Sequence, residues 1–263
     1  MNKTKRRAAK RTSRRQSLRH NHRGGVIKTK KYPDGSSLTG DFDHKNRLVG
    51  LGKMTYDNGE YYEGNFKGVL PHGKGRYVWT TGYTYTGNHT DGKMAGKGVL
   101  TYPDGAMYEG DFKDDKKNGV GKLTENNGCV YEGQFLHDHP HGQGKYACPN
   151  GDVYEGQFQD GVRHGHGKLI KANGYVYEGE FNNNRVEGEG HLTFPDGRVY
   201  EGMVSETANG DLIGRDDMPP MEIISDPSHM TPAQIADFAQ YKRDLKRAQI
   251  AELVAIARAS AGH

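Results

Sequence analysis

Histidines at alternate positions are the residues whose spacing most resembles a site for chemistry. They form the clusters His137-x-His139-x-His141 and His164-x-His166. On a strand, alternate residues share a face, and neighbouring imidazoles can bind Zn²⁺ or Cu²⁺. No cysteine or carboxylate recurs with them, and corresponding segments of the chain carry arbitrary polar residues. We therefore expect solvated loop histidines, with no metal site and no cofactor.

Glutamates and Gly-x-Gly motifs recur along the chain and would be the next candidates. A phosphate-binding glycine loop needs a helix N-terminus after it, and none is predicted there. On neighbouring hairpins the glutamates would lie ~10 Å apart, too far for a paired acid/base site. We expect an acidic stripe, paired with lysines such as Lys122, Lys145 and Lys168, and we predict no catalytic residues, no enzymatic activity and no small-molecule substrate. The recurring glutamates are Glu63, Glu109, Glu132, Glu155, Glu178 and Glu201.

An exact internal repeat organises the middle of the chain. The tripeptide Tyr-x-Gly recurs every 23 residues, which is the signature of a repeat architecture. A divergent copy precedes the series at Leu38-Thr39-Gly40. The repeated tyrosines are Tyr62, Tyr85, Tyr108, Tyr131, Tyr154, Tyr177 and Tyr200.

Each repeat has the pattern of a β-hairpin. Tyr108, Gly110 and Phe112 fall on one face of a strand, and Glu109 falls on the other. Glycine weakens a strand, so its regular presence needs a reason. We predict that each of these glycines leaves room for an aromatic ring to lie flat against the backbone. The residues predicted to build the repeat are Tyr62, Gly64, Phe66, Tyr108, Gly110, Phe112, Tyr131, Gly133, Phe135, Tyr154, Gly156, Phe158, Tyr177, Gly179 and Phe181.

Turn signals separate the repeated strands. Asn-Gly and Asp-Gly pairs accept positive φ and favour hairpins, and a preceding proline presets a type I turn. These pairs are Asn58-Gly59, Asp104-Gly105, Asn150-Gly151, Asn173-Gly174 and Asp196-Gly197. The fold class predicted is mostly β: an elongated, single-layer antiparallel meander of about seven hairpins and roughly fifteen short strands.

This pattern resembles the MORN (membrane occupation and recognition nexus) repeat, whose signature is YEGxFxxGxxxGxGxxxxxxG. The segments from Tyr108 to Gly128 and from Tyr154 to Gly174 meet it well. The repeat at 85–107 departs from it, with Thr86 in place of Glu and His89 in place of Phe, and the first repeat lacks its tyrosine. We expect those two hairpins to be less regular. The resemblance implies a scaffold or adaptor, and family members in cytoskeletal and ciliary assemblies set the precedent.

The first 31 residues differ from the rest in charge. They hold thirteen Lys or Arg and no acid, whereas the remaining chain is net acidic. We predict a disordered basic arm over 1–31 that binds an acidic surface, namely a microtubule, an anionic lipid or a nucleic acid. The alternative is a solvated tail without a specific partner. The arm residues singled out for that role are Lys5, Arg6, Arg7, Lys10, Arg11, Arg14 and Arg15.

The repeat ends after Gly202, so we divide the chain into the arm, a ribbon over 32–204, an extended linker over 205–230 and a helix over 231–260. Thr231, Pro232 and Gln234 supply the N-cap, the first helical position and a capping box. This C-terminal helix either covers the sheet or docks on a partner. Its candidate partner-binding residues are Ile235, Phe238, Tyr241, Leu245 and Leu253.

Two cysteines, Cys129 and Cys148, are too few for a disulfide framework in a chain of 263 residues. We predict that both are reduced thiols of an intracellular protein. No apolar run approaches the ~20 residues of a membrane span, and the N-terminus lacks the apolar region of a secretory signal. The expected location is the cytoplasm, the cytoskeleton or a ciliary or flagellar axoneme, with the nucleus as an alternative.

The sequence and the resemblance lead to three hypotheses for the function. The first is a non-enzymatic scaffold that binds the proteins of a multi-subunit assembly through its ribbon and C-terminal helix. The second is a tether to anionic phospholipid that uses the basic arm. The third is a nuclear or nucleic-acid-associated adaptor.

Overall fold

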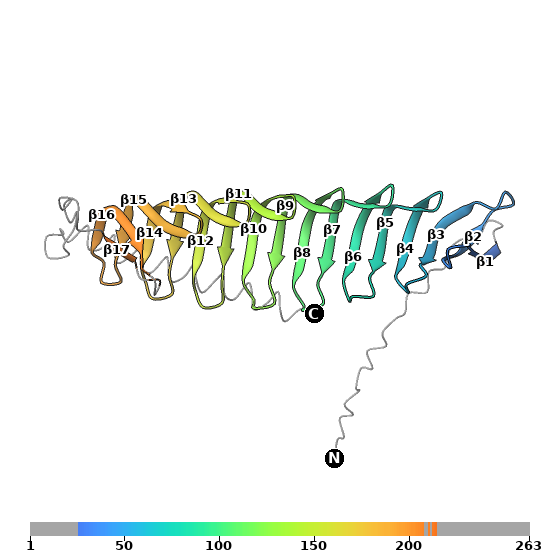
Figure 1. The fold of residues 1–263 in the computed structure, drawn as a ribbon, viewed down its shortest axis with the longest axis horizontal. Helices are drawn as coiled ribbons and strands as arrows, with labels where there is room; N and C mark the ends of the chain where they lie inside the picture. The colour runs from blue at the N-terminus through green and yellow to red at the C-terminus, as the bar shows by residue number, and fades with distance from the viewer. Residues whose placement is uncertain (1–25, 208–209, 211, 215–263) are drawn as a thin grey trace, which may run out of the picture.

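The computed structural model describes residues 26–207, 210 and 212–214, which form one antiparallel sheet of 17 strands. Each strand pairs with the next one along the chain, so the hairpins line up along the long axis of the molecule (Figure 1). The strands are β1 (Val26–Lys31), β2 (Ser37–Phe42), β3 (Leu48–Thr55), β4 (Tyr61–Lys67), β5 (Leu70–Val78), β6 (Thr84–Thr90), β7 (Lys93–Thr101), β8 (Met107–Lys113), β9 (Lys116–Thr124), β10 (Val130–Leu136), β11 (His139–Ala147), β12 (Val153–Gln159), β13 (Val162–Ile170), β14 (Val176–Asn182), β15 (Arg185–Thr193), β16 (Val199–Glu206) and β17 (Leu212–Gly214).

The predicted fold class needs correction. The single-layer antiparallel meander is present, but the described residues contain strands only and no helix, so the fold they form is all-β. None of them forms a helix that could span a membrane. The helix expected over 231–260, with its candidate partner residues, lies outside the described residues, as does the basic arm over 1–25.

The sheet also extends past both of its predicted boundaries. Strand β1 occupies Val26–Lys31, inside the segment assigned to the arm, and β16 and β17 run into the segment assigned to the linker. At the first boundary the strand was missed because its lysines were assigned to the basic arm. The ammonium groups of Lys28 and Lys30 lie over the ring of Phe42 on β2, 5.4 and 4.3 Å from its centroid. Long basic side chains can cover apolar surface in this way.

Two kinds of turn alternate along the ribbon. At the predicted Asn-Gly and Asp-Gly turns only the glycine adopts positive φ, as at Gly105, and its N–H donates to the carbonyl three residues earlier. The opposite ends of the hairpins were expected to be polar loops, but from β6–β7 to β14–β15 they are tight turns of two residues with positive φ, such as Asp114 and Asp115. Asp and Asn tolerate this conformation. Mirror-image turns of this kind match the twist of the strands they join.

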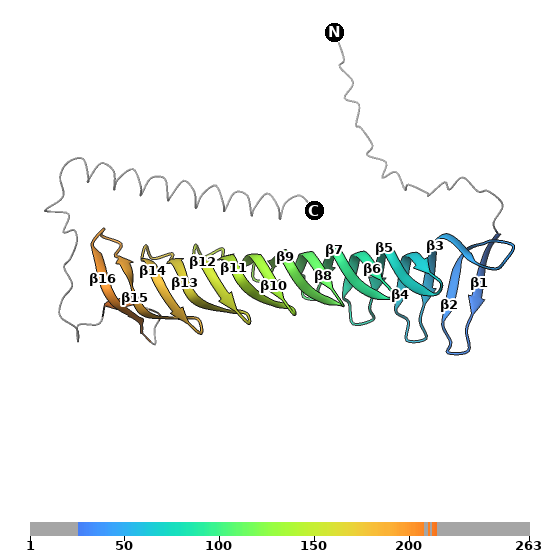
Figure 2. The same ribbon diagram turned by 90° about the horizontal axis from the view of Figure 1, so that it is seen from above.

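A register shift bends each of the seven repeat hairpins, from β2–β3 to β14–β15, directly after the glycine of the first strand. Between β12 and β13, Gly156 lies opposite Gly167, but Phe158 lies opposite Arg163. The second strand therefore carries extra residues at this point, and Gly165 there has φ = 60°. Bulges of this kind increase local twist and bend the strand. Figure 2 shows the resulting row of similarly inclined hairpins.

Aromatic rings join one hairpin to the next. The ring of Tyr108 makes an edge-to-face contact with Phe112 in its own repeat (5.1 Å between centroids) and with Phe135 in the next repeat (4.9 Å). The same pair of contacts recurs around Tyr131 and Tyr154. Stability thus comes from contacts between neighbours, as in other solenoid proteins.

Hairpin β6–β7 keeps the regular backbone, contrary to expectation, whereas hairpin β2–β3 is less regular at its tip. In β6–β7, Tyr85 lies opposite Leu100 and Gly87 opposite Gly98, with the same register shift as in other repeats. In β2–β3, Leu38 takes the place of the tyrosine and is 2% exposed. Both hairpins retain the paired glycines, but the tip of β2–β3 is a longer turn over 43–47 in which only Asn46 has positive φ.

Candidate partner-binding groove

The repeated tyrosines occupy one face of the sheet as a buried row. Tyr108 is fully buried, and its hydroxyl donates to the carbonyl of Asp111 at 2.9 Å. Tyr85, Tyr131 and Tyr154 each make the same bond to the residue three positions ahead, at 2.8 Å. That carbonyl lies at the register shift, where the regular strand pairing is interrupted. Burial raises the pKa of Tyr131 and Tyr154 to about 12, so these phenols remain protonated hydrogen-bond donors at neutral pH.

From β4–β5 to β14–β15, the second glycine of Gly-x-Gly accommodates the tyrosine ring. A Cβ at Gly121 would lie 2.4 Å from the hydroxyl oxygen of Tyr108 and 2.5 Å from a ring carbon. The ring is buried and the backbone is paired, so a side chain at this position would fit only if the tyrosine ring left its site. The predicted placement of rings flat against glycine backbone is confirmed at this position.

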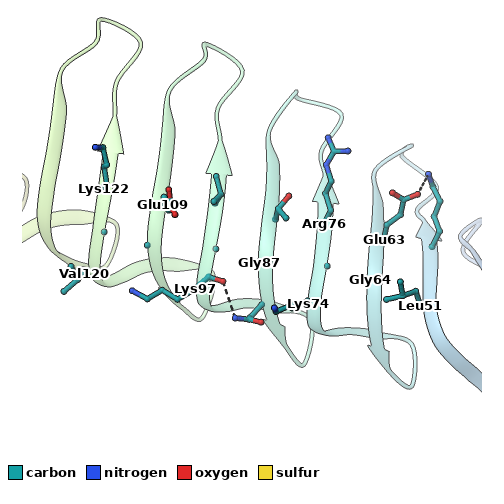
Figure 3. A pocket seen from close by; sticks show the side chains of 18 of the residues that line it. Leu51, Glu63, Gly64, Lys74, Arg76, Gly87, Lys97, Glu109, Val120 and Lys122 are labelled. Carbon is teal, nitrogen blue, oxygen red and sulfur yellow. Dashed lines mark hydrogen bonds and ion pairs between the residues drawn. The ribbon is translucent and has the colours of Figure 1, made fainter. Parts of the chain in front are cut away.

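The opposite face, which we call the groove face, is hollowed along its N-terminal half. A groove with a volume of about 1390 Å³ extends from Thr39 on β2 to Gly133 on β10. Two rows of side chains border it (Figure 3). One row contains Glu63, Arg76, Glu109 and Lys122, and the other contains Leu51, Lys74, Lys97 and Val120.

Ion pairs between hairpins form a ladder in the first of these rows. Each ladder rung joins the residue after Gly-x-Gly on one hairpin to the glutamate of Tyr-Glu-Gly on the next. The rungs include Lys53–Glu63 (3.0 Å), Lys122–Glu132 (2.6 Å) and Lys168–Glu178 (3.3 Å), and at the equivalent position the Nε2 atom of His191 lies 3.3 Å from a carboxylate oxygen of Glu201. The predicted pairing of the acidic stripe with Lys122 and Lys168 is confirmed.

Two consecutive rungs are missing from the ladder inside the groove. Arg76 lies opposite Thr86, and Glu109 lies opposite Val99. Thr86 and Val99 are themselves partners in β6–β7. Across the described ranges, neither the guanidinium of Arg76 nor the carboxylate of Glu109 has an ion-pair or hydrogen-bond partner. The ladder is therefore interrupted by an uncharged gap with an unpaired cation on one side and an unpaired anion on the other.

The histidine clusters do not converge on a common point. His137 lies in a two-residue turn with φ = 49°, whereas His139 and His141 belong to β11. His166 lies on β13, with its Nδ1 3.4 Å from an oxygen of Glu180. Within residues 26–207, 210 and 212–214, no three His, Cys, Asp or Glu side chains are grouped so that they could hold a metal ion.

The prediction of two reduced thiols is wrong, because a disulfide joins Cys129 and Cys148. Val130 lies opposite Ala147, so the cysteines that flank this pair face each other at the end of hairpin β10–β11. Their Cα atoms are 4.1 Å apart. The repeat contained a signal for this: Tyr131 pairs with Tyr146, and each cysteine lies two residues beyond that pair. The number of cysteines alone does not reveal the bond; the strand register does. The expected intracellular location therefore no longer has free thiols as support.

Sequence reasoning also missed the groove residues. Lys74, Val99 and Val120 occupy positions that vary between repeats, so the repeat pattern gave them no weight. The signal that could have found them is the departure at Thr86, combined with the cross-strand register. The arm residues and the helix residues singled out above lie outside the described residues.

Comparisons with known proteins agree with the repeat geometry. The family model described as MORN repeat matches residues 39–61, 62–82, 85–107, 108–130, 131–153, 154–174 and 177–197. Comparison with curated protein sequences finds no match.

Two solved structures share a low-identity likeness with the chain. One is the TCP10 domain of CPAP from Danio rerio, with 18% identity and a TM-score of 0.32 over 71% of this chain and 98% of that one. The other is the TCP domain of SAS-4 (dCPAP) in complex with a proline-rich motif of Ana2 (dSTIL) from Drosophila melanogaster. It has 14% identity and a TM-score of 0.30 over 67% of this chain and 89% of that one. Structures this different in overall shape support no functional conclusion.

The matched repeats cover more than half of the chain, and they coincide with the seven hairpins that begin at β2–β3 and end at β14–β15. Repeats of this kind indicate a structural repeat protein that binds proteins or membranes. The chain belongs to the MORN-repeat family.

Proposed function

We propose that the protein is a non-enzymatic scaffold or adaptor that binds other proteins of a multi-subunit assembly through its groove face. The observation that carries this proposal is the groove of about 1390 Å³ along β2–β10. It lies on the face that the aromatic core leaves free, and it combines exposed apolar side chains with unpaired charges.

The two faces of the sheet have separate roles. On the core face, Tyr108 and Phe112 are buried by their neighbours and leave little surface for a partner. On the groove face, Val120 is 58% exposed and Leu51 is 41% exposed. Exposed apolar side chains that line a groove beside charged ones are typical of surfaces that bind partners.

The residues most available for chemistry already have structural roles. The tyrosine hydroxyls donate to backbone carbonyls, and burial keeps them protonated. The ladder glutamates Glu63, Glu132 and Glu178 each form an ion pair with a lysine of the preceding hairpin. These uses support a scaffold in preference to an enzyme.

The family resemblance supports a place in the cytoplasm, within a cytoskeletal or ciliary (axonemal) assembly. Such assemblies need elongated proteins that hold several partners in a line. A 17-strand ribbon provides repeated, evenly spaced positions along one axis (Figure 1). A nuclear location would follow instead if the basic residues over 1–25 acted as an import signal.

Photo-crosslinking in cells tests the proposal. A benzophenone-bearing residue replaces Val120 in the groove, and in a matched control it replaces Ile213 on β17, which is 47% exposed and lies outside the groove. We expect a discrete protein adduct from the groove position only. Equal adducts from both positions, or none from the groove, would contradict the proposal.

Vesicles separate the scaffold from the lipid tether. Sedimentation with phosphatidylcholine vesicles, with and without phosphatidylserine, is measured for the full chain and for a variant that lacks residues 1–25. A tether predicts binding to the anionic vesicles that is lost with the deletion. The scaffold predicts that groove adducts persist in the deletion variant.

A further inference from the structure

In the interrupted part of the charge ladder, unlike in the rungs, charged side chains lie opposite uncharged ones on the neighbouring strand. Arg76 and Lys74 lie two residues apart on β5, so their side chains share a face about 7 Å apart. Thr86 and Asn88 lie opposite them on β6, where an acid would neutralise them. On the other side of Arg76, Glu63 already pairs with Lys53. Two like charges therefore remain side by side.

The anion of the interrupted segment lies three strands away. Glu109 on β8 has Val99 on one side and Lys122 on the other, and Lys122 pairs with Glu132 at 2.6 Å. Neighbouring strands lie about 4.8 Å apart, so Arg76 and Glu109 are separated by roughly 14 Å. Thr86 and Val99 occupy the space between them and carry no charge.

The width of the groove favours one shape of ligand. Lys74 and Arg76 belong to the two bordering rows, with Gly75 between them on the floor. The rows are thus about 7 Å apart, and backbone forms the floor between them because the side-chain position of Gly75 faces the ring of Tyr62 on the core face. A helix with its side chains is about 10–12 Å wide, which exceeds that separation. An extended chain fits between the rows.

We propose that the gap between Arg76 and Glu109 recognises an extended segment of a partner protein. An acidic side chain of that segment lies against Arg76 and Lys74, apolar side chains lie over Thr86 and Val99, and a basic side chain lies against Glu109. An extended chain advances about 3.3 Å per residue, so the acid and the base are about four positions apart. This inference rests on the proposed function, whose binding face it narrows to β5–β8.

Charge complementarity is the argument for this occupant. Unpaired charges on both sides of an uncharged strip reject a segment that carries its acid and base in the opposite order, because such a segment would place like charges together. A segment that carries only apolar residues would cover both charges and leave them without partners. The regular rungs, such as Lys168–Glu178, offer no such selection since their charges already neutralise each other.

Restoring the ladder is the sharpest test. In the double variant T86E/V99K, Arg76 and Glu109 gain the rung partners that other hairpins have. In the matched control K168V/E178T, a rung of the same chemistry is removed outside the groove. Exposed pairs of this kind change stability little, and thermal unfolding of both variants checks that they are folded.

The probe is a library of random 12-residue peptides displayed on phage and selected against the full-length wild-type chain. We expect enriched peptides with an acid and a base about four positions apart and apolar residues between them. Measured by fluorescence anisotropy, the peptides should bind T86E/V99K at least tenfold more weakly than the wild type, and K168V/E178T as tightly as the wild type.

The outcomes separate this inference from the proposed function. Enriched peptides that bind the wild type and T86E/V99K equally would overturn the inference, while groove adducts in cells would still support the scaffold. Enriched peptides without the paired charges would also overturn it. If no peptide is enriched and the groove position yields no adduct, both proposals fail.

Discussion

Among the differences between hairpin β6–β7 and hairpin β12–β13, one lies in the row of rings on the core face and two lie in the ion-pair ladder of the groove face. On the core face, His89 occupies the site that Phe158 fills in the regular repeat. On the groove face, Thr86 and Val99 replace Glu155 and Lys168. The two hairpins nevertheless share one register and the same bend. The repeat thus separates backbone geometry, which the tyrosine, glycines and turns determine, from surface chemistry, which can vary.

The largest expected effect concerns the buried tyrosine that each of the two hairpins has at the same position. Tyr85 and Tyr154 are both buried, and each donates to the carbonyl three residues ahead at 2.8 Å. Replacement of either by alanine removes a ring from the junction of two hairpins and should cost about 3–5 kcal/mol. The loss is measured as a shift of the urea unfolding midpoint. An effect confined to Tyr154→Ala would show that β6–β7 is packed differently from the regular repeat.

The next effect concerns the disulfide, which the regular hairpin β12–β13 lacks. Cys129 and Cys148 are 19 positions apart, and closing a loop of that size in the unfolded chain contributes roughly 3 kcal/mol. We expect the variant C129S/C148S to show faster amide hydrogen exchange in β10 and β11 than in β12 and β13. Treatment of the wild-type chain with dithiothreitol should give the same pattern. Unchanged exchange in β10–β11 would contradict a stabilising disulfide.

His89 should make hairpin β6–β7 sensitive to pH. It is 3% exposed between the rings of Tyr62 and Tyr85, and neither ring nitrogen meets hydrogen-bond geometry with any residue that the structure describes. Burial lowers the pKa of His89, so the folded state favours the neutral ring. The unfolded pKa is about 6.5, so stability is fully present above that pH and falls as the pH drops below it toward the folded pKa.

His89→Phe supplies the ring of the regular repeat and should stabilise the hairpin by roughly 1–2 kcal/mol at neutral pH. Thermal unfolding of both proteins is measured between pH 7.5 and 5. We expect the stability advantage of the variant over the wild type to grow on acidification. Unfolding of the wild type exposes His89, which then binds a proton, whereas phenylalanine cannot bind one. An advantage that shrinks at low pH would show that protonated His89 has an acidic partner in the fold.

The smallest expected effect concerns a regular ladder rung. Glu178 and Lys168 are about half exposed, and pairs of this kind contribute about 0–1 kcal/mol. Glu178→Gln should therefore lower the midpoint slightly, and 1 M NaCl should remove most of the difference. A larger, salt-resistant loss would show that the ladder stabilises the sheet, and the gap at Thr86 would then also weaken β6–β7.

The core face was largely predictable from the sequence because it depends on local period and spacing. Tyr108, Gly110 and Phe112 alternate within one strand, and the 23-residue repeat shows that the next hairpin offers the same residues. The groove face depends on which residue lies opposite which. The departure at Thr86 was visible in the sequence, but its consequence for Arg76 requires the register between β5 and β6. The cysteine pair was missed for the same reason.

A charge exchange tests the central claim most directly. The variant R76E/E109R reverses the two charges that border the gap and keeps Thr86 and Val99. Anisotropy titrations compare a peptide selected by the wild-type chain with a synthetic version in which its acid and base are exchanged. The account predicts that the variant loses at least tenfold in affinity for the first peptide and regains it for the second. A variant that binds both peptides as the wild type does would contradict a partner site between Arg76 and Glu109.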